Sequence, residues 1–438
     1  MITVDQQGKL QRLMAMLCLL ALCLTPALGS AASLVSIVSL LIAVPLAFNQ
    51  RNWSSSKAKH LLAGALLSYF GYFLFLDFLI TRDFGTSFLA MSPNTPLLAL
   101  AVIVLALDPK RAMLSASSIG KGASFAVLAS AGMAGLIWLV QPSWQLLGYN
   151  LTNVSGVNGR LMLLSGNPLP FAATYMTLGF LAPMGWHDRS KTSQGFAVAA
   201  LATAVSLAAV WALSRGATLA ALPLAVLAIW YLRPRPKTLL AVAMGLSIVI
   251  AAMIVLGGFG ERVSGSVDRL IRGVSTVASG DPSMESSTGQ RLIMYRAGLA
   301  AWIESPIWGY GISQRFSAII PYLDESYEHV RYTHLHNTFI THAVAGGLIG
   351  VFIVLVLLLT PMAINRADGS SDRDQQYLAW LIFLSLAGVG MSSVILNQDV
   401  SAHFLALLMV THLLLHHDKI ASSEPRDTHQ QKLDEIRV

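Results

Sequence analysis

The chain has 438 residues, of which 55% are hydrophobic and 12% are charged. An ordinary soluble domain carries about 25% charged residues, so this composition excludes a disordered chain and a soluble enzyme. In a soluble protein, the net charge of +7 and a pI near 9.5 would suggest nucleic-acid binding. A mean hydropathy of +0.62 favours a membrane protein with basic cytoplasmic loops instead, and we expect no nucleic-acid partner.

Apolar runs of about 17–25 residues can cross a bilayer, and they recur along the whole chain. They predict an all-α polytopic membrane protein with about twelve transmembrane helices. The predicted spans are residues 13–29, 32–48, 60–80, 90–107, 122–140, 168–186, 195–213, 217–232, 238–258, 337–364, 376–395 and 400–417. Residues 1–30 also resemble a cleavable signal peptide, and we favour an uncleaved first span.

Four regions follow from these spans. Residues 1–258 hold transmembrane helices 1–9, residues 259–336 form one large loop, residues 337–417 hold helices 10–12, and residues 418–438 form a cytoplasmic tail. With both termini cytoplasmic, that side carries 19 of the 29 Lys and Arg residues and every lysine. The large loop then lies on the opposite, periplasmic face.

Within the large loop, residues 291–304 predict an amphipathic helix at the membrane interface. Leu292, Tyr295, Leu299 and Trp302 recur there at spacings of three and four residues.

Every basic residue on the non-cytoplasmic side is an arginine, whose planar guanidinium can bind phosphate oxygens bidentately. Arg160 lies in a Gly- and Asn-rich loop, Arg215 in a Ser-Arg-Gly turn between two spans, and Arg291 at the start of the predicted amphipathic helix. The alternative is a snorkelling or salt-bridged arginine. That alternative weighs more heavily for Arg262, Arg269, Arg272, Arg296 and Arg315.

His334 and His336 mark the junction of the large loop with the tenth span. A histidine at this border can be neutral near pH 7, as a general base requires, and Asn337 can orient it or cap the following helix. Helix capping or plain solvation of the histidines is the alternative. A zinc site would need three protein ligands, and the spacing to His329 or His342 matches no zinc motif, so we predict neither metal nor cofactor.

Two carboxylates lie near the same face, Asp77 at the end of the third span and Asp399 in the last short loop. Each is either a functional acid or the partner of a nearby arginine. The sequence has no Gly-rich phosphate loop, no serine nucleophile elbow and no series of charges along the spans. It therefore argues against nucleotide chemistry, a serine hydrolase and an ion-coupled transporter.

The stretch from Thr288 to Gly311, TGQRLIMYRAGLAAWIESPIWGYG, resembles the O-antigen ligase and polymerase family of bacterial envelope glycosyltransferases. So do His336-Asn337 ahead of a span containing Gly346-Gly347, the Ser214-Arg215-Gly216 turn, and the stretch from Arg160 to Asn167-Pro168. The layout of about twelve spans with one late periplasmic loop covers essentially the whole chain.

This resemblance implies a C-type glycosyltransferase fold in the inner membrane of a Gram-negative bacterium, with the active site facing the periplasm. It implies a donor glycan on undecaprenyl diphosphate and, in a ligase, lipid A-core as acceptor. By resemblance, Arg215 and Arg291 match the family's essential arginines and His336 its essential histidine. Asp399 matches an acidic position of some ligases. Arg160, Asn337, His334 and Arg262 are further candidates for substrate binding.

We expect Arg215 and Arg291, with Arg160, to hold the diphosphate in place of a metal ion, while His336 accepts the proton of the acceptor hydroxyl. A single displacement would invert the anomeric carbon. The alternatives are an O-antigen polymerase, a protein O-oligosaccharyltransferase, and a transporter that moves lipid-linked glycans without chemistry.

Overall fold

The computed structural model describes most of the chain. The described residues are 4–49, 56–140, 145–146, 149–150, 152–153, 160–188, 191–208, 212, 214–233, 268, 271–272, 275, 287–323, 334–367, 369 and 372–416.

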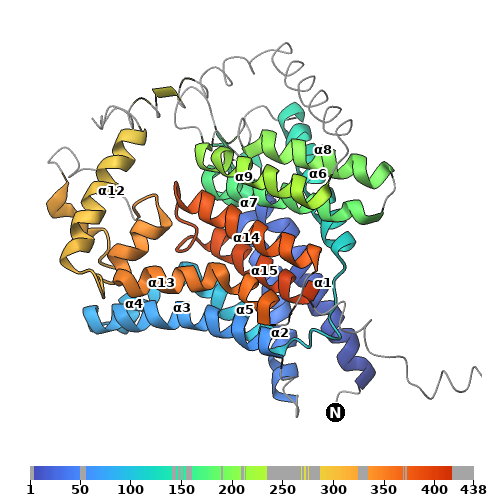
Figure 1. Ribbon diagram of the computed structural model, residues 1–438, viewed down its shortest axis with the longest axis horizontal. Helices are drawn as coiled ribbons and strands as arrows, with labels where there is room; N and C mark the ends of the chain where they lie inside the picture. The colour runs from blue at the N-terminus through green and yellow to red at the C-terminus, as the bar shows by residue number, and fades with distance from the viewer. Residues whose placement is uncertain are drawn as a thin grey trace, which may run out of the picture.

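Helices make up nearly all of the described structure (Figure 1). The α-helices are α1 (Val4–Leu28), α2 (Ser33–Asn49), α3 (Lys57–Thr81), α4 (Phe84–Met91), α5 (Thr95–Ala106), α6 (Ala116–Val140), α7 (Pro168–Leu181), α8 (Lys191–Ser206), α9 (Arg215–Leu232), α12 (Ser287–Glu304), α13 (Thr338–Ala367), α14 (Arg373–Gly390) and α15 (Asp399–His416). Short 3-10 helices lie at Gly29–Ala32, Ser92–Asn94, Leu163–Ser165, Ala182–Asp188 and Ser317–Tyr322.

Four two-residue strands form two antiparallel hairpins, one of β1 (Gln145–Leu146) with β2 (Tyr149–Asn150) and one of β3 (Thr152–Asn153) with β4 (Arg160–Leu161).

The helices confirm an α-helical polytopic membrane protein. Five stretches of the described chain are long and apolar enough to cross a bilayer: Asp5–Leu46, Lys57–Thr81, Phe84–Ala106, Ala116–Leu136 and Thr338–Ala367. Each predicted span coincides with one or two helices except 238–258, which lies outside the described residues. The count of twelve, the division into four regions and the periplasmic loop stay predictions.

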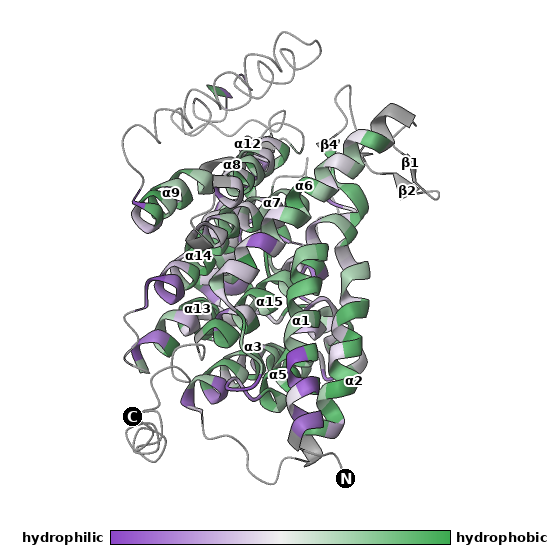
Figure 2. Ribbon diagram, turned by 90° about the vertical axis from the view of Figure 1, so that its right-hand side faces the viewer, coloured by the Kyte–Doolittle hydropathy of each residue, from purple (hydrophilic) through white to green (hydrophobic). Residues whose placement is uncertain are grey.

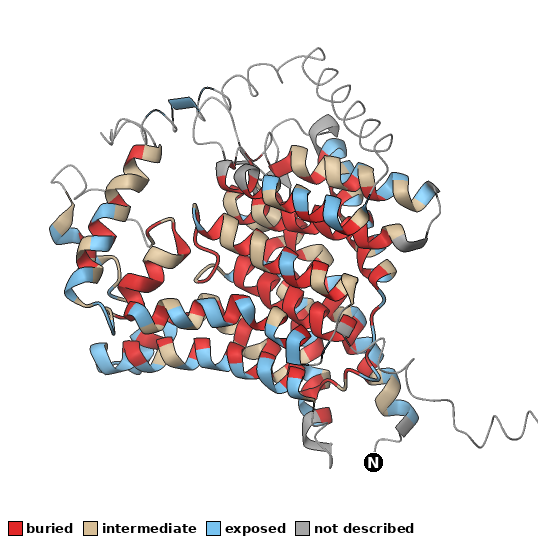
Figure 3. Ribbon diagram, viewed as in Figure 1, coloured by how far each residue is buried: buried red, intermediate tan, exposed pale blue. Residues whose placement is uncertain are grey.

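Helix α15 forms the centre of the bundle. Every residue from 400 to 415 is buried, as expected for a helix that is apolar over most of its surface. It packs against α1, α5, α14 and α7 (Figure 3).

The outer helices carry apolar side chains on their exposed faces. Leu34 and Leu41 of α2 are 65% and 67% exposed, and Leu348 and Phe352 of α13 are 61% and 64% exposed. In water such surfaces would aggregate, whereas lipid chains cover them without cost. Figure 2 shows the same trend, with mostly hydrophobic helices and hydrophilic stretches toward several helix ends.

Candidate functional site

Residues 334–337 form a tight turn in front of α13. His336 adopts a left-handed φ of 52°, and its backbone N–H donates to His334 Nδ1 over 3.3 Å. The two imidazole rings meet edge to face, with 4.4 Å between their centroids. Asn337 Oδ1 accepts hydrogen bonds from the N–H groups of Phe339 and Ile340, which makes Asn337 the N-cap of α13. The turn therefore fixes both histidines at the N-terminus of α13.

Residues 391–398, which join α14 to α15, hold this turn in place; we call them the 391–398 loop. The backbone carbonyl of Met391 accepts a hydrogen bond from Asn337 Nδ2 (3.1 Å) and lies 3.3 Å from the Tyr295 hydroxyl. The Tyr295 hydroxyl donates to the His336 carbonyl over 3.0 Å. Thr338 Oγ1 donates to the Ser393 carbonyl and accepts from the N–H of Ile395, each over 3.0 Å.

The same loop contacts the start of α9. A Cβ atom built on Gly216 would lie 1.7 Å from Ser392 Oγ and 3.0 Å from Ser392 Cβ, so a larger residue would force the Ser392 side chain or the start of α9 to move. Ser214 caps α9 through a hydrogen bond from the N–H of Ala217. Arg215 is thus the first residue of a helix whose N-terminus abuts Ser392, although its side chain lies outside the described structure.

Helix α12 brings Arg291 to the histidine turn. Burial, together with smaller effects of His334 and the charge of Arg291, lowers the pKa of His336 to about 3. Burial also lowers the pKa of His334 to about 4, together with the charges of Arg315 and Arg291. Both rings are therefore neutral at pH 7. The charge of Arg291 also reaches Tyr295, where it opposes the rise in pKa that burial causes.

Arg315 supplies a second positive charge near His334, from the segment that follows α12. Burial lowers its pKa to about 10, while Tyr69 and Asp77 oppose that shift, so Arg315 remains cationic at pH 7. Asp77 of α3 is fully buried, and its Oδ1 accepts hydrogen bonds from the backbone N–H and the hydroxyl of Ser313, each over 2.8 Å. Asp77 thus anchors the segment that carries Arg315.

The glycines that follow α12 allow its C-terminal end to join the backbone of α13. The N–H groups of Tyr310 and Gly311 donate to the carbonyls of Val344 and Ala345 over 2.9 and 2.8 Å, and the N–H of Leu348 donates to the Pro306 carbonyl over 2.8 Å. Gly347, with φ 60°, interrupts α13 at this point.

Close packing explains two of these glycines. A Cβ atom on Gly309 would lie 2.5 Å from the Val344 carbonyl oxygen, and one on Gly347 would lie 2.1 Å from the Ile307 carbonyl oxygen.

Helix α12 confirms the helix predicted over residues 291–304, but a different face packs against the protein. Met294, Ala297 and Ala301 are buried, whereas Leu299 is 43% exposed. The predicted apolar stripe therefore lies partly on the outer side of the helix.

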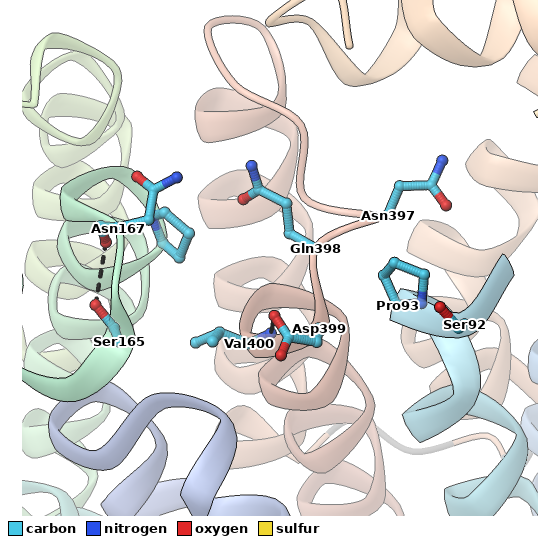
Figure 4. Close-up of a pocket in the computed structure, with 9 residues that line it drawn as sticks. Ser92, Pro93, Ser165, Asn167, Asn397, Gln398, Asp399 and Val400 are labelled. Carbon is cyan, nitrogen blue, oxygen red and sulfur yellow. Dashed lines mark hydrogen bonds between the residues drawn. The ribbon is translucent and has the colours of Figure 1, made fainter. Parts of the chain in front are cut away.

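Asp399 begins α15 and lies beside a pocket next to the histidine turn. Its Oδ1 accepts from the N–H of Val400 over 2.8 Å, and its Oδ2 accepts from the Ser30 hydroxyl. The pocket has a volume of about 420 Å³ (Figure 4). Its lining residues are Ser92, Pro93, Ser165, Asn167, Pro170, Asn397, Gln398, Asp399 and Val400. Gln398 also contacts His334, with 3.5 Å between the two Nε2 atoms.

Besides Arg215, three of the candidate arginines have no described side chain. Arg160 lies in β4, with only its backbone described, and Arg262 lies outside the described residues, as does Arg269. Arg272 is exposed. Among the described side chains, no group of three or more His, Cys, Asp and Glu residues is placed to hold a metal ion.

Two parts of the site were not predicted from the sequence. One is the role of Tyr295 as a hydrogen-bond donor, and the other is the 391–398 loop. Met391, Ser393 and Ile395 act through backbone atoms, for which side-chain patterns give no signal.

Residues 197–355 match a family model described as O-antigen ligase. The matched region includes Arg215, Arg291 and His336 and ends before the 391–398 loop. No curated protein matches the sequence.

Proposed function

We propose that the chain transfers O-antigen polysaccharide from undecaprenyl diphosphate to lipid A-core, because residues 197–355 match a family model described as O-antigen ligase. The family match supports a membrane glycosyltransferase of the ligase or polymerase type. The proposal places the protein in the inner membrane of a Gram-negative bacterium, with both termini cytoplasmic and the histidine turn facing the periplasm.

One observation carries the proposal: three distant segments converge on the 391–398 loop. These are the start of α9 with Arg215, helix α12 with Arg291 and Tyr295, and the turn at His336. A diphosphate needs cationic hydrogen-bond donors, and a hydroxyl acceptor needs a neutral base within reach. The convergence supports placing both requirements in one site.

In the proposed reaction, the acceptor hydroxyl oxygen attacks the anomeric carbon of the donor and forms the new glycosidic bond. The bond between that carbon and the phosphate oxygen breaks, its electron pair leaves with undecaprenyl diphosphate, and His336 takes the hydroxyl proton. Attack opposite the leaving group inverts the anomeric carbon. Arg215 and Arg291 stabilise the charge of the departing diphosphate, without a metal ion.

The low pKa of His336 in the free protein fits a base that becomes active when the donor binds. Burial mainly holds the ring neutral, and the positive charge of Arg291 contributes to the same effect. A bound diphosphate would pair with that charge and place negative charge nearby, and both effects raise the pKa of the imidazole toward the value that suits a general base. Arg160, Arg262, His334, Asn337 and Asp399 stay proposed substrate contacts.

The first test is a gel of lipopolysaccharide from a strain that lacks the gene, beside its complemented parent. Loss of the whole O-antigen ladder, with free core and accumulated lipid-linked polymer, supports the ligase. Core that carries a single repeat unit indicates the polymerase instead. An unchanged ladder excludes both and points to a protein O-oligosaccharyltransferase or a transporter.

Purified protein tests the residue roles. We expect His336→Ala to reduce turnover by about 10²–10⁴-fold, the contribution of a general base, and wild-type turnover in this variant would remove the assignment. Arg291→Gln should weaken donor binding, whereas the matched control Arg296→Gln, on the exposed side of the same helix, should not. Full activity in EDTA supports the metal-free reaction, and rescue only by Mg²⁺ or Mn²⁺ refutes it.

A further inference from the structure

The pocket beside Asp399 is built from segments that are far apart in the sequence. Ser92 and Pro93 precede α5, Ser165 and Asn167 precede α7, and residues 397–400 span the end of the 391–398 loop and the start of α15. Its volume of about 420 Å³ lies within the range of small-molecule sites, about 300–1,000 Å³. In Figure 4 the side-chain amides of Asn167, Gln398 and Asn397 extend toward the same side of the close-up.

The pocket differs in charge from the arginine side of the histidine turn. Of the described residues that line it, Asp399 alone is ionisable, and the others offer hydroxyls, amides and the apolar surfaces of Pro93, Pro170 and Val400. The charges of Arg291 and Arg315 act on the histidines instead. A carboxylate among neutral groups disfavours a phosphate, whereas hydroxyls and amides beside apolar surface suit a neutral sugar ring.

Two buried atoms of the amides at the pocket lack a hydrogen-bond partner within the described structure, Gln398 Oε1 and Asn397 Nδ2. Buried polar groups are rarely left unsatisfied, so these atoms indicate a missing ligand or water. His334 Nδ1 accepts the N–H of His336, so the neutral His334 ring carries its proton on Nε2. Turning the Gln398 amide by 180° lets its oxygen accept that proton, and the NH₂ group then takes the buried position that has no partner within the described structure.

We propose that this pocket binds a neutral sugar ring of the glycan substrates, next to the diphosphate site, with Gln398 and Asn167 as hydrogen-bonding residues. The inference rests on the proposed function. The pocket is close to the proposed base, because Gln398 contacts His334 and the His334 ring lies against His336. The ring is either the donor sugar attached to the diphosphate or the terminal sugar of the acceptor.

Equilibrium binding to the purified full-length protein in nanodiscs tests this without requiring turnover. The probes are undecaprenyl diphosphate, the same lipid carrying its glycan, and a phosphate-free core oligosaccharide. We expect Gln398→Leu to weaken binding of one glycan probe by about 3- to 10-fold, the loss of one or two hydrogen bonds, and to leave bare undecaprenyl diphosphate unchanged. The control Gln376→Leu, near the opposite end of α14, should change no probe.

The pattern of losses identifies the source of the sugar. Weaker core oligosaccharide binding assigns the pocket to the acceptor, and weaker binding of the glycan-bearing lipid alone assigns it to the donor. Unchanged binding of both glycan probes in Gln398→Leu overturns the proposal, as does failure of the wild-type protein to bind either. A wild-type protein that binds the glycans but shows no transfer contradicts the proposed function and supports the sugar pocket.

Asn167→Asp tests the charge argument. Asn167 Oδ1 accepts from the N–H of Leu169 over 2.9 Å, so an aspartate keeps the cap of α7 while it adds a negative charge to the pocket. If the pocket holds a neutral ring, binding of bare undecaprenyl diphosphate should fall by less than about tenfold, because the added charge lies beside the diphosphate and not in contact with it. A loss of tenfold or more would mean that phosphate occupies the pocket, and would overturn the proposal.

Discussion

The hydroxyl of Tyr295 donates a hydrogen bond to the backbone carbonyl of His336 over 3.0 Å and lies 3.3 Å from the carbonyl of Met391. One side chain of α12 thus connects the histidine turn to the 391–398 loop. Because His336 adopts a left-handed backbone conformation, this bond helps to fix the direction of its imidazole.

Tyr295→Phe should therefore lower kcat by about tenfold, the loss of one hydrogen bond, and leave the KM for the donor nearly unchanged. Steady-state kinetics with varied donor concentration measures both. Tyr310→Phe is the control, because that hydroxyl donates to the Ala301 carbonyl, within the α12 segment. An equal fall in kcat for both variants would contradict a positioning role for Tyr295.

Gly216→Ala should displace the start of α9 from Ser392 and lower turnover by about tenfold. Ser392→Gly in the same chain removes the clashing atoms and should restore most of the activity. Gly195→Ala in α8 is the matched control, since its Cβ would meet no atom within 4 Å. Equal activity of the single and double variants would show that the contact does not matter.

Gly347→Ala should destabilise the folded protein by more than about 3 kcal/mol, because an alanine is strained at a φ of 60° and its Cβ would meet the Ile307 carbonyl. The measurement is the yield of monodisperse protein in detergent. Gly132→Ala in α6, where a Cβ meets nothing within 4 Å, should be neutral or stabilising by up to about 1 kcal/mol. Wild-type yield from Gly347→Ala would contradict the described joining of α12 to α13.

Stability should fall as the pH drops below about 6.5. The pKa of His336 is lowered from 6.5 to about 3 in the folded protein, so the unfolded chain binds a proton that the folded chain does not. Well above pH 6.5 the His336 ring is neutral in both states and does not lower the free energy of unfolding. By pH 5 its protonation in the unfolded chain lowers the free energy of unfolding by up to about 2 kcal/mol. His336→Gln should reduce the difference in melting temperature between pH 7.5 and pH 5, and an unchanged difference would contradict the shift.

The helices were largely predictable because lipid-facing helices need long apolar runs. Predicted span 60–80 corresponds to α3, and 337–364 to α13, within three residues at each end. The buried face of α12 was not predictable. Apolar residues occur on both sides of this helix, and small residues such as Ala297 and Ala301 make the contact instead of Leu299.

The candidate site was predictable only in part. The histidine pair and its capping asparagine follow from residue type at a helix start. For Asp77 the sequence allowed two roles, a functional acid or the partner of an arginine. Its hydrogen bonds to the backbone and hydroxyl of Ser313 could not be predicted, because the fold brings together residues 236 positions apart. The contact between Gly216 and Ser392 likewise could not be predicted from the residues around either position.

The interruption of α13 at Gly347 limits how the site can open. The carbonyls of Val344 and Ala345 are satisfied by Tyr310 and Gly311, so pulling α12 away from α13 would leave bare backbone oxygens in an apolar interior. These bonds favour movement of α12 and α13 together. A wider entrance would cost less on the other side, where the described contact between the start of α9 and Ser392 is the close packing of Gly216.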